Sequence, residues 1–248
     1  QFPLSNTTNI RFIFPLDKQQ YLCKIISVDN IKGLFTEMKF HEFKKKIADF
    51  PVFSTSHLSS LGGNQQVLRN QLTKWQNRGL VIKLRKGLYV LGELDRKITP
   101  SRLFLANQLY QPSYVSTEYA LGFYDIIPER VYDITSVSPK KTVTFENEFG
   151  RFVYQHIKTE GFKEYKMIAD ENGFNCFIAD PEKALVDYCY LNLPLFKTRP
   201  HIIFDSLRLQ NLKLLKTKKI MAYAEVFGSN RLTEIAQSLI GYIREVRT

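Results

Sequence analysis

Hydrophobic residues just after position 37 recur at the spacing of an amphipathic helix. Pro51 would end this helix, because a proline disfavours helical geometry at the residue before it. The apolar positions lie three or four residues apart, at Phe40, Phe43, Ile47 and Phe50. A first helix is therefore expected to begin near Lys39 and to end before Pro51.

Two further helices and a hairpin are predicted before position 92. Ser54-Thr55-Ser56 offers N-caps for a short helix ending at Gly62-Gly63, and Asn64 can cap a third helix running to about Asn77. Two β-prone runs, 80–84 and 88–91, flank the turn Arg85-Lys86-Gly87. Three helices followed by a basic-tipped hairpin is the element order of a winged helix-turn-helix.

A mixed pattern follows a charged, turn-like stretch at 93–100. Residues 101–125 predict two helices, with Ser116 capping the second, and the chain from Pro181 onward is mostly helical, with a break at Gly228-Ser229-Asn230. The strand-prone segments between them are Val131–Val137, Lys141–Phe145, Arg151–Ile157, Tyr165–Ala169 and Phe174–Ala179, with an Asn172-Gly173 turn before the last.

The expected fold class is α+β, in two domains. A winged helix-turn-helix at 38–95 would precede a larger mixed α/β domain at 96–248, with an antiparallel sheet and C-terminal helices. Residues 1–37 have no sustained helical period and form an N-terminal extension of uncertain status. They could be a small β arm packed on the domain, or an extension that precedes a natural start at Met38.

Charge is distributed unevenly along the chain. The formal net charge is +11, and residues 38–92 hold ten of the basic residues but only Glu42 and Asp49 as acids, a net charge of +8. From Pro51 to Gly92 there is no acidic residue. A stretch without acids cannot repel phosphate locally, so this distribution favours a nucleic-acid partner.

The third helix carries the residue types that read bases. Its stripe of Leu68, Leu72 and Trp75 would face the core. Gln and Asn can pair with adenine and Arg with guanine in the major groove. We expect Gln65, Gln66, Arg69 and Asn70 to reach base edges, with Thr73 on the same open face and Lys74 and Arg78 closer to phosphates. A merely solvated helix would normally mix glutamates with its lysines.

The hairpin is the candidate wing. Lys83, Arg85 and Lys86 would carry cations to the DNA backbone or the minor groove. The alternative is a hairpin whose edge lysines only keep it from aggregating. Its position directly after the third helix favours the wing.

Two other functions compete with DNA binding by a regulator. Glu164-Tyr165-Lys166, with Asp133 upstream, loosely matches the acid-x-Lys pattern of metal-dependent nucleases, which would use the winged helix for targeting. Patterns this short arise readily by chance, and no other catalytic, metal or cofactor motif is found, so we expect no enzyme activity. A purely protein-binding winged helix is the third possibility, and the acid-free stretch argues against it.

Cysteine use and hydropathy indicate a cytoplasmic protein. The chain has an odd number of cysteines, Cys23, Cys176 and Cys189, and no two of them form a C-x-x-C pair. Buried, reduced thiols are therefore expected. No apolar run approaches the length of a transmembrane helix, and no secretory signal is evident.

Three segments together resemble the AbiEi-type antitoxin regulators of bacterial type IV toxin–antitoxin systems. Residues 76–91 resemble the wing of that family, 114–121 the helix after the winged helix, and 179–187 its P-E-(K/R)-A-(L/I)-x-D segment. The three occur in the family's order and the resemblance covers about 40–248. Residues 1–37 have no counterpart in it.

The resemblance implies a double-stranded DNA-binding transcriptional regulator that represses its own operon through inverted repeats. It also implies a functional link to a nucleotidyltransferase toxin, without a stable complex, that depends on the larger domain. The 181–187 motif has a structural interpretation as well: Pro181 begins a helix, Glu182 favours its positive end, and Ala184, Leu185 and Tyr188 pack inward.

Overall fold

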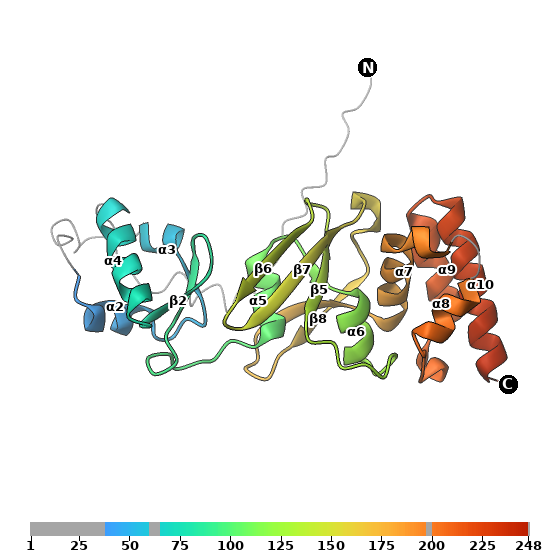
Figure 1. Ribbon diagram of the computed structural model, residues 1–248, viewed down its shortest axis with the longest axis horizontal. Coiled ribbons are helices and arrows are strands. Elements are labelled where there is room, and N and C mark those ends of the chain that lie inside the picture. Colours follow the sequence, from blue (N-terminus) through green and yellow to red (C-terminus); the bar gives the residue numbers. More distant parts are fainter. Residues whose placement is uncertain (1–37, 60–64, 197–199, 248) are drawn as a thin grey trace, which may run out of the picture.

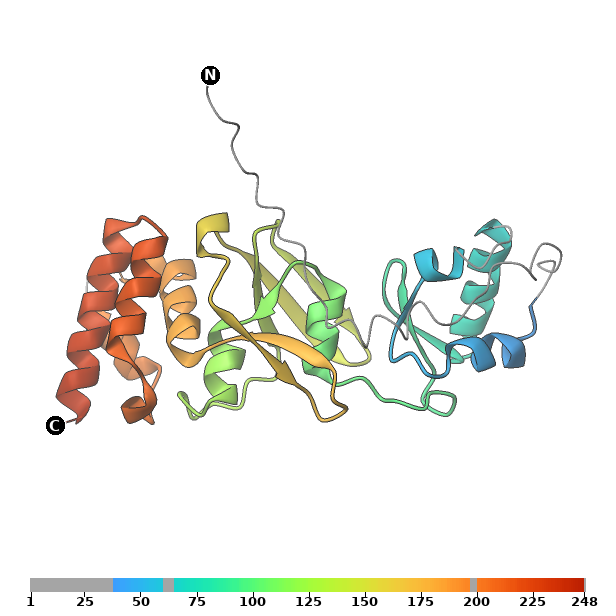
Figure 2. The ribbon, with the colours of Figure 1, turned by 180° about the vertical axis from the view of Figure 1, so that it is seen from behind.

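The computed structural model describes residues 38–59, 65–196 and 200–247. They form three parts in a row: a small N-terminal unit, a six-stranded sheet with its covering helices, and a helical end that finishes in α10 (Figures 1 and 2). The protein is thus a mixed α/β chain, as expected at that level. The N-terminal extension, Gly62-Gly63, Asn64 and Cys23 lie outside the described residues.

The small unit places short helices against a three-stranded sheet. In chain order its elements are α2 (Phe40–Ile47), β1 (Phe53–Ser54), α3 (Thr55–Ser59), α4 (Gln65–Asn77), β2 (Val81–Arg85) and β3 (Leu88–Leu91). The strand order is β1-β3-β2, and both pairs are antiparallel. The helices and the hairpin follow the expected pattern, whereas the two-residue strand β1 was not predicted.

The β2–β3 hairpin is apolar on both faces. Val81, Tyr89 and Leu91 belong to the small core with Phe43 and Trp75. The alternate positions join the large core of the rest of the chain instead; they are Ile82, Leu84, Leu88 and Val90. Because successive side chains of a strand point to opposite faces, the hairpin forms a wall between two cores.

The second sheet is mixed, which corrects the expected antiparallel sheet. Its strands are β4 (Tyr114–Val115), β5 (Ile134–Ser138), β6 (Val143–Asn147), β7 (Gly150–His156), β8 (Tyr165–Ala169) and β9 (Asn175–Ala179). They are ordered β6-β7-β5-β4-β9-β8, and the β5–β7 and β4–β9 pairs are parallel.

The unexpected parallel pairs follow from the order in which the strands are connected. The connection after β5 carries the chain past the neighbouring position, so that β7 rather than β6 returns beside β5 and runs parallel to it. The short strand β4 inserts between β5 and β9. Five strands fall close to their predicted segments, and Gly173 adopts a φ of +76° in the β8–β9 turn, which the Asn172-Gly173 pair anticipated.

Helices cover the sheet and build the far end. The α-helices are α5 (Arg102–Leu109), α6 (Thr117–Phe123), α7 (Pro181–Leu191), α8 (Pro200–Ser206), α9 (Thr217–Val226) and α10 (Asn230–Arg247). Short 3-10 turns lie at Thr159–Gly161, Leu193–Phe196 and Leu212–Leu214. Helix α5 packs against β4, β5 and β9, while α7 packs against α6 and α9. Within the described ranges, no helix is both long and apolar enough to cross a membrane.

Helix α7 buries charge as well as apolar surface. Ala184 and Leu185 are buried as expected, and Tyr188 is half-buried. The sequence did not indicate that Glu182, Lys183 and Asp187 would be buried too, each 3% exposed or less. Lys183 is paired with Asp187, which also accepts hydrogen bonds from Tyr114 (2.9 Å) and Ser116 (2.8 Å), and Glu182 accepts the Lys216 amide. Every charge in this group that is out of water therefore has a partner.

The expectation for the two described cysteines is confirmed in part. Cys176 and Cys189 are buried and form no disulfide. Burial raises the pKa of each thiol to about 12, so both remain protonated at neutral pH. They act as small apolar residues of the core.

Candidate nucleic-acid interface

Helix α4 is anchored by an aromatic cluster on its inner face. Leu72 and Trp75 are buried, and the Trp75 ring lies 4.6 Å from that of Phe43 and 5.5 Å from that of Phe40. Phe53 on β1 continues the cluster, 5.4 Å from Phe43. This packing fixes which side of α4 remains in solvent, because a helix presents one stripe to its core.

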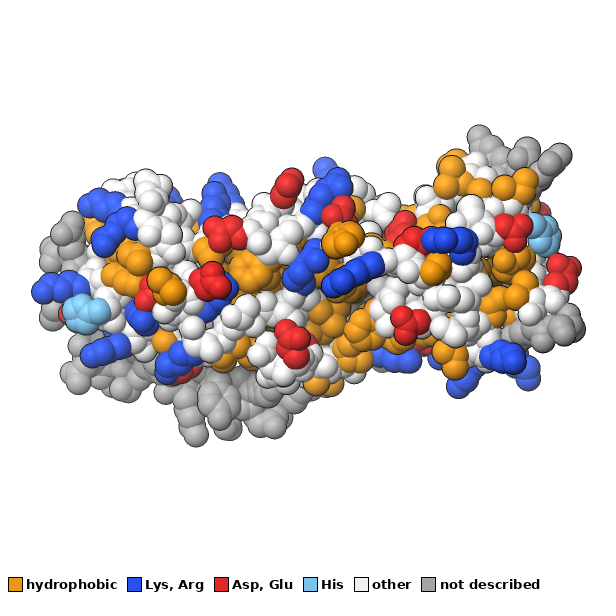
Figure 3. Space-filling model, turned by 60° about the horizontal axis from the view of Figure 1, so that its bottom comes forward, with side chains coloured by type: hydrophobic (Ala, Val, Ile, Leu, Met, Phe, Trp, Pro, Cys, Tyr) orange, Lys and Arg blue, Asp and Glu red, His pale blue; other side chains and the backbone are white. Residues whose placement is uncertain are grey.

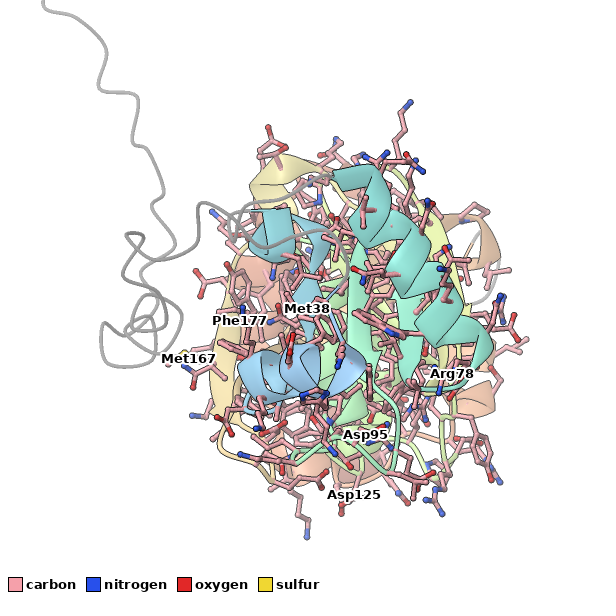
Figure 4. All side chains as sticks on the ribbon, turned by 90° about the vertical axis from the view of Figure 1, so that its left-hand side faces the viewer. Met38, Arg78, Asp95, Asp125, Met167 and Phe177 are labelled. Carbon is pink, nitrogen blue, oxygen red and sulfur yellow. The ribbon has the colours of Figure 1, made fainter. Side chains whose placement is uncertain are left out.

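The outer face of α4 carries most of the predicted contact residues. Gln65 begins the helix, but its side chain lies outside the described part of the structure. Exposed on the open face are Gln66, Arg69, Asn70, Thr73, Lys74 and, just after the helix, Arg78. Figure 4 looks at this end of the molecule, with α4 running down to the labelled Arg78. The structure thus brings the described members of the predicted set onto one face.

Hydrogen bonds along α4 arrange some of these side chains. Gln66 Nε2 donates to Asn70 Oδ1 at 3.1 Å, and this bond leaves the Asn70 amide nitrogen available as a donor to a ligand. The Thr73 hydroxyl donates to the Arg69 carbonyl at 3.0 Å. That bond makes Thr73 less available than its neighbours as a donor to a ligand.

Four cations of the α4 region and the hairpin have no carboxylate partner within the described ranges. Among the residues that the structure describes, Arg69, Arg78, Lys83 and Lys86 are exposed and form no ion pair. By contrast, Lys44 on α2 pairs with Asp95 at 2.7 Å. In the space-filling view of Figure 3, basic side chains outnumber acidic ones over the N-terminal unit, and the two alternate over the rest. Positive charge left unneutralised attracts an anionic partner.

The hairpin tip is held in a fixed place beside α3. Gly87 has a φ of +81°, in the left-handed region that glycine adopts without a Cβ penalty. Its carbonyl accepts the Thr55 amide at 3.1 Å, and a Cβ on Gly87 would lie 3.3 Å from Thr55 Oγ1. Lys86 is thereby presented to solvent at the tip, and Lys83 is exposed on β2.

Arg85 lies differently from the other predicted wing residues. It is half-buried, and its Nε donates to the carbonyl of Leu109 at the end of α5, at 2.7 Å. Its Nη1 donates to the Lys86 carbonyl at 2.9 Å. The guanidinium is therefore engaged with the second unit. Asn147, 63 residues beyond Leu84 in the chain, also reaches the hairpin, by a hydrogen bond to the Leu84 carbonyl, and no sequence pattern indicated this contact.

The residues of the alternative nuclease site do not come together. Asp133 pairs with Arg151 of β7 at 2.8 Å, while Glu164 and Lys166 lie at β8, the edge strand on the far side of the sheet. Three strand spacings separate β5 from β8, roughly 14 Å. Over the described segments, no three His, Cys, Asp or Glu residues are grouped as metal ligands.

The open face of α4 offers donors and cations, with an apolar cluster behind it, and the hairpin offers the further exposed cations Lys83 and Lys86. Such a surface can bind phosphate groups and hydrogen-bond to base edges. The chain matches no protein-family model, and no curated protein matches it.

Proposed function

We propose that residues 38–92 are a winged helix-turn-helix that binds double-stranded DNA, with α4 as the recognition helix. One observation carries this proposal: the outer face of α4 holds Gln66, Arg69, Asn70 and Lys74 without any acidic residue. The order of three helices and a hairpin, with the strand order β1-β3-β2, supports it.

The roles of the individual side chains follow from their chemistry and position. Gln65, Gln66, Arg69 and Asn70 occupy the first turns of α4, which in helix-turn-helix proteins reach the bases. Arg69 can form two hydrogen bonds with guanine, and Asn70 with adenine. Lys74 and Arg78, further along, are suited to phosphates, as are Lys83 and Lys86 on the hairpin. Thr73 is a weaker candidate because its hydroxyl is already bonded.

We further propose that the protein is a transcriptional regulator without enzyme activity, of the AbiEi antitoxin type. The family's three segments contribute the hairpin, the β4–α6 region and the start of α7. In this proposal the protein binds inverted repeats in its own promoter. The larger unit opposes a nucleotidyltransferase toxin without forming a stable complex with it.

A mobility shift on the DNA upstream of the protein's own gene tests the first proposal. Wild type is compared with Arg69→Ala/Asn70→Ala at two salt concentrations. We expect the double variant to lose sequence-specific binding, because each lost base contact costs about 1–3 kcal/mol. Weak, salt-sensitive binding should persist, since the phosphate contacts remain.

Lys213→Ala, a substitution on the distant helical end, is the matched control and should bind as wild type does. A double variant that keeps full specific binding would remove α4 from base recognition. If wild type itself binds neither this DNA nor a random duplex at low salt, the DNA-binding function is wrong.

A further inference from the structure

The outer face of the hairpin is covered by the second unit. A hairpin that serves as a free wing has one face in solvent, but Ile82, Leu84 and Leu88 are each 8% exposed or less and pack into the large core. Strand β2 lies against β6. Only the hairpin tip and Lys83 remain available to a ligand.

Two side-chain hydrogen bonds fasten the hairpin to that unit from different elements. The Arg85 guanidinium reaches out to the carbonyl of Leu109, the last residue of α5, at 2.7 Å. A cation is favourable at this helix end, because the last carbonyls of a helix lack internal partners. From the other side, Asn147 Nδ2 at the end of β6 donates to the Leu84 carbonyl at 3.2 Å.

The segment that connects the two units is held as well. Lys97 pairs with Asp49 next to α2 at 2.7 Å, and Lys44 of α2 pairs with Asp95, which Figure 4 labels below that helix. At its other end, the Thr99 carbonyl accepts a hydrogen bond from Asn172 of the β8–β9 turn at 3.0 Å. The small unit is thus attached to the rest of the chain both at the hairpin and at the connection.

We propose that Arg85 and Asn147 are positioning residues for DNA recognition. Arg85 reaches from the hairpin to the end of α5, and Asn147 reaches from β6 to the hairpin, so that Lys86 at the tip and the open face of α4 are held at a set angle to meet the same duplex. The second unit thereby controls DNA selectivity through residues that do not touch DNA. This inference rests on the proposed DNA binding, and it changes the expected role of Arg85 from a DNA contact to a support.

The salt dependence of binding separates a support from a contact. A cation that neutralises a phosphate contributes about 0.9 to the slope of log K against log salt. We compare Arg85→Met with Lys86→Met in the full chain, using a duplex selected by wild type from a random library and a scrambled duplex. The active fraction of each protein is measured by stoichiometric titration, and its folding by thermal unfolding.

For Arg85→Met we expect the slope of wild type and a roughly tenfold lower ratio of selected to scrambled affinity, equivalent to one lost base contact. For Lys86→Met we expect the opposite: a slope lower by about 0.9 and an unchanged ratio. A merely destabilised protein would lower the active fraction and leave both quantities as in wild type, which would overturn the inference.

A second variant keeps the test decisive if Arg85→Met does not fold. Asn147→Ser retains a hydroxyl that can accept the Phe149 amide, as Asn147 Oδ1 does at 2.9 Å, but is too short to reach Leu84. Loss of selectivity in Asn147→Ser supports the inference, and wild-type selectivity overturns it. A slope lower by about 0.9 in Arg85→Met, with the ratio kept, makes Arg85 a phosphate contact and overturns it too. If wild type selects no duplex, the proposed function fails, and this inference falls with it.

Discussion

Charged side chains are used in opposite ways at α4 and at α7. On α4 and the hairpin, Arg69, Arg78 and Lys86 lie in solvent and face no carboxylate within the described residues. On α7, Lys183 and Asp187 are removed from water and paired. The charges of the first set remain available to attract an anion. The charges of the second set are already neutralised by each other, so they need no ligand.

This difference separates a binding surface from an element of architecture. A buried ion pair offsets its desolvation with its own hydrogen bonds, and it becomes costly only when one partner is removed. Exposed cations contribute little to stability and can be exchanged with small effect on folding. Substitutions on α7 should therefore change stability, and substitutions near α4 should change DNA binding alone.

The largest loss of unfolding free energy is expected for Lys183→Met. Its ammonium group lies over the rings of Tyr114 (5.6 Å) and Phe227 (5.0 Å) and is paired with Asp187. Removing it leaves a buried carboxylate without a cation, which costs about 3–5 kcal/mol. Urea unfolding monitored by circular dichroism measures this loss of unfolding free energy.

The double variant Lys183→Met/Asp187→Asn is the matched control for this prediction. The amide oxygen introduced by Asp187→Asn could still accept from Tyr114 or Ser116, and no lone charge would remain. The double variant should therefore be more stable than Lys183→Met. A loss below about 1 kcal/mol in the single variant would show that water reaches Asp187, and the contrast with α4 would weaken.

A smaller, pH-dependent loss of unfolding free energy is expected for Asp180→Asn at the N-cap of α7. Burial acts to raise the pKa of Asp180, but hydrogen bonds from Lys219 (2.6 Å), the Lys183 amide (2.9 Å) and Tyr223 (2.9 Å) outweigh it and lower that pKa. Asparagine is an equally good N-cap, so the variant removes the charge and keeps the cap. We expect a loss of about 2 kcal/mol at pH 7.

The pH at which this loss disappears follows from the lowered pKa. A carboxyl with a depressed folded pKa contributes stability above its unfolded pKa, about 3.9, and loses that contribution as the pH falls through the folded value. The difference in unfolding free energy between wild type and Asp180→Asn should therefore be constant above about pH 5 and become smaller below it. A gap that is the same at pH 3 and pH 7 would exclude the Asp180 charge as its cause.

Individual helices and hairpins could be predicted from the sequence, because the patterns that indicate them lie within a few neighbouring residues. The stripe of Leu68, Leu72 and Trp75 predicted the orientation of α4, and β-prone runs on either side of a Gly-containing turn predicted the hairpin and β8–β9. The open face of α4 followed from the same stripe. These features depend on residues that are close together in the chain.

Pairings between distant segments were not predictable in the same way. The parallel β5–β7 pair and the two-residue strand β4 are set by tertiary packing, which overrides a short run's own preference. The contact of Asn147 with Leu84 joins residues 63 positions apart. One signal for the covered hairpin was present: strands buried on both faces have continuous apolar runs, as Leu88–Leu91 does.

The smallest effect on stability is expected for Lys83→Gln, which tests the α4 side of the contrast. Lys83 is exposed between the buried Ile82 and Leu84 and lies opposite Tyr89 in the hairpin register. Its charge has no carboxylate partner among the described residues, so the unfolding free energy should change by less than about 0.5 kcal/mol. If Lys83 meets a phosphate, the slope of log K against log salt for DNA binding should fall by about 0.9.

Urea unfolding and binding titrations at several salt concentrations measure the two quantities on the same protein. A stability loss above about 1 kcal/mol with an unchanged slope would make Lys83 a structural residue of the hairpin, because the cost would then come from packing on Tyr89 and not from a missing ligand contact.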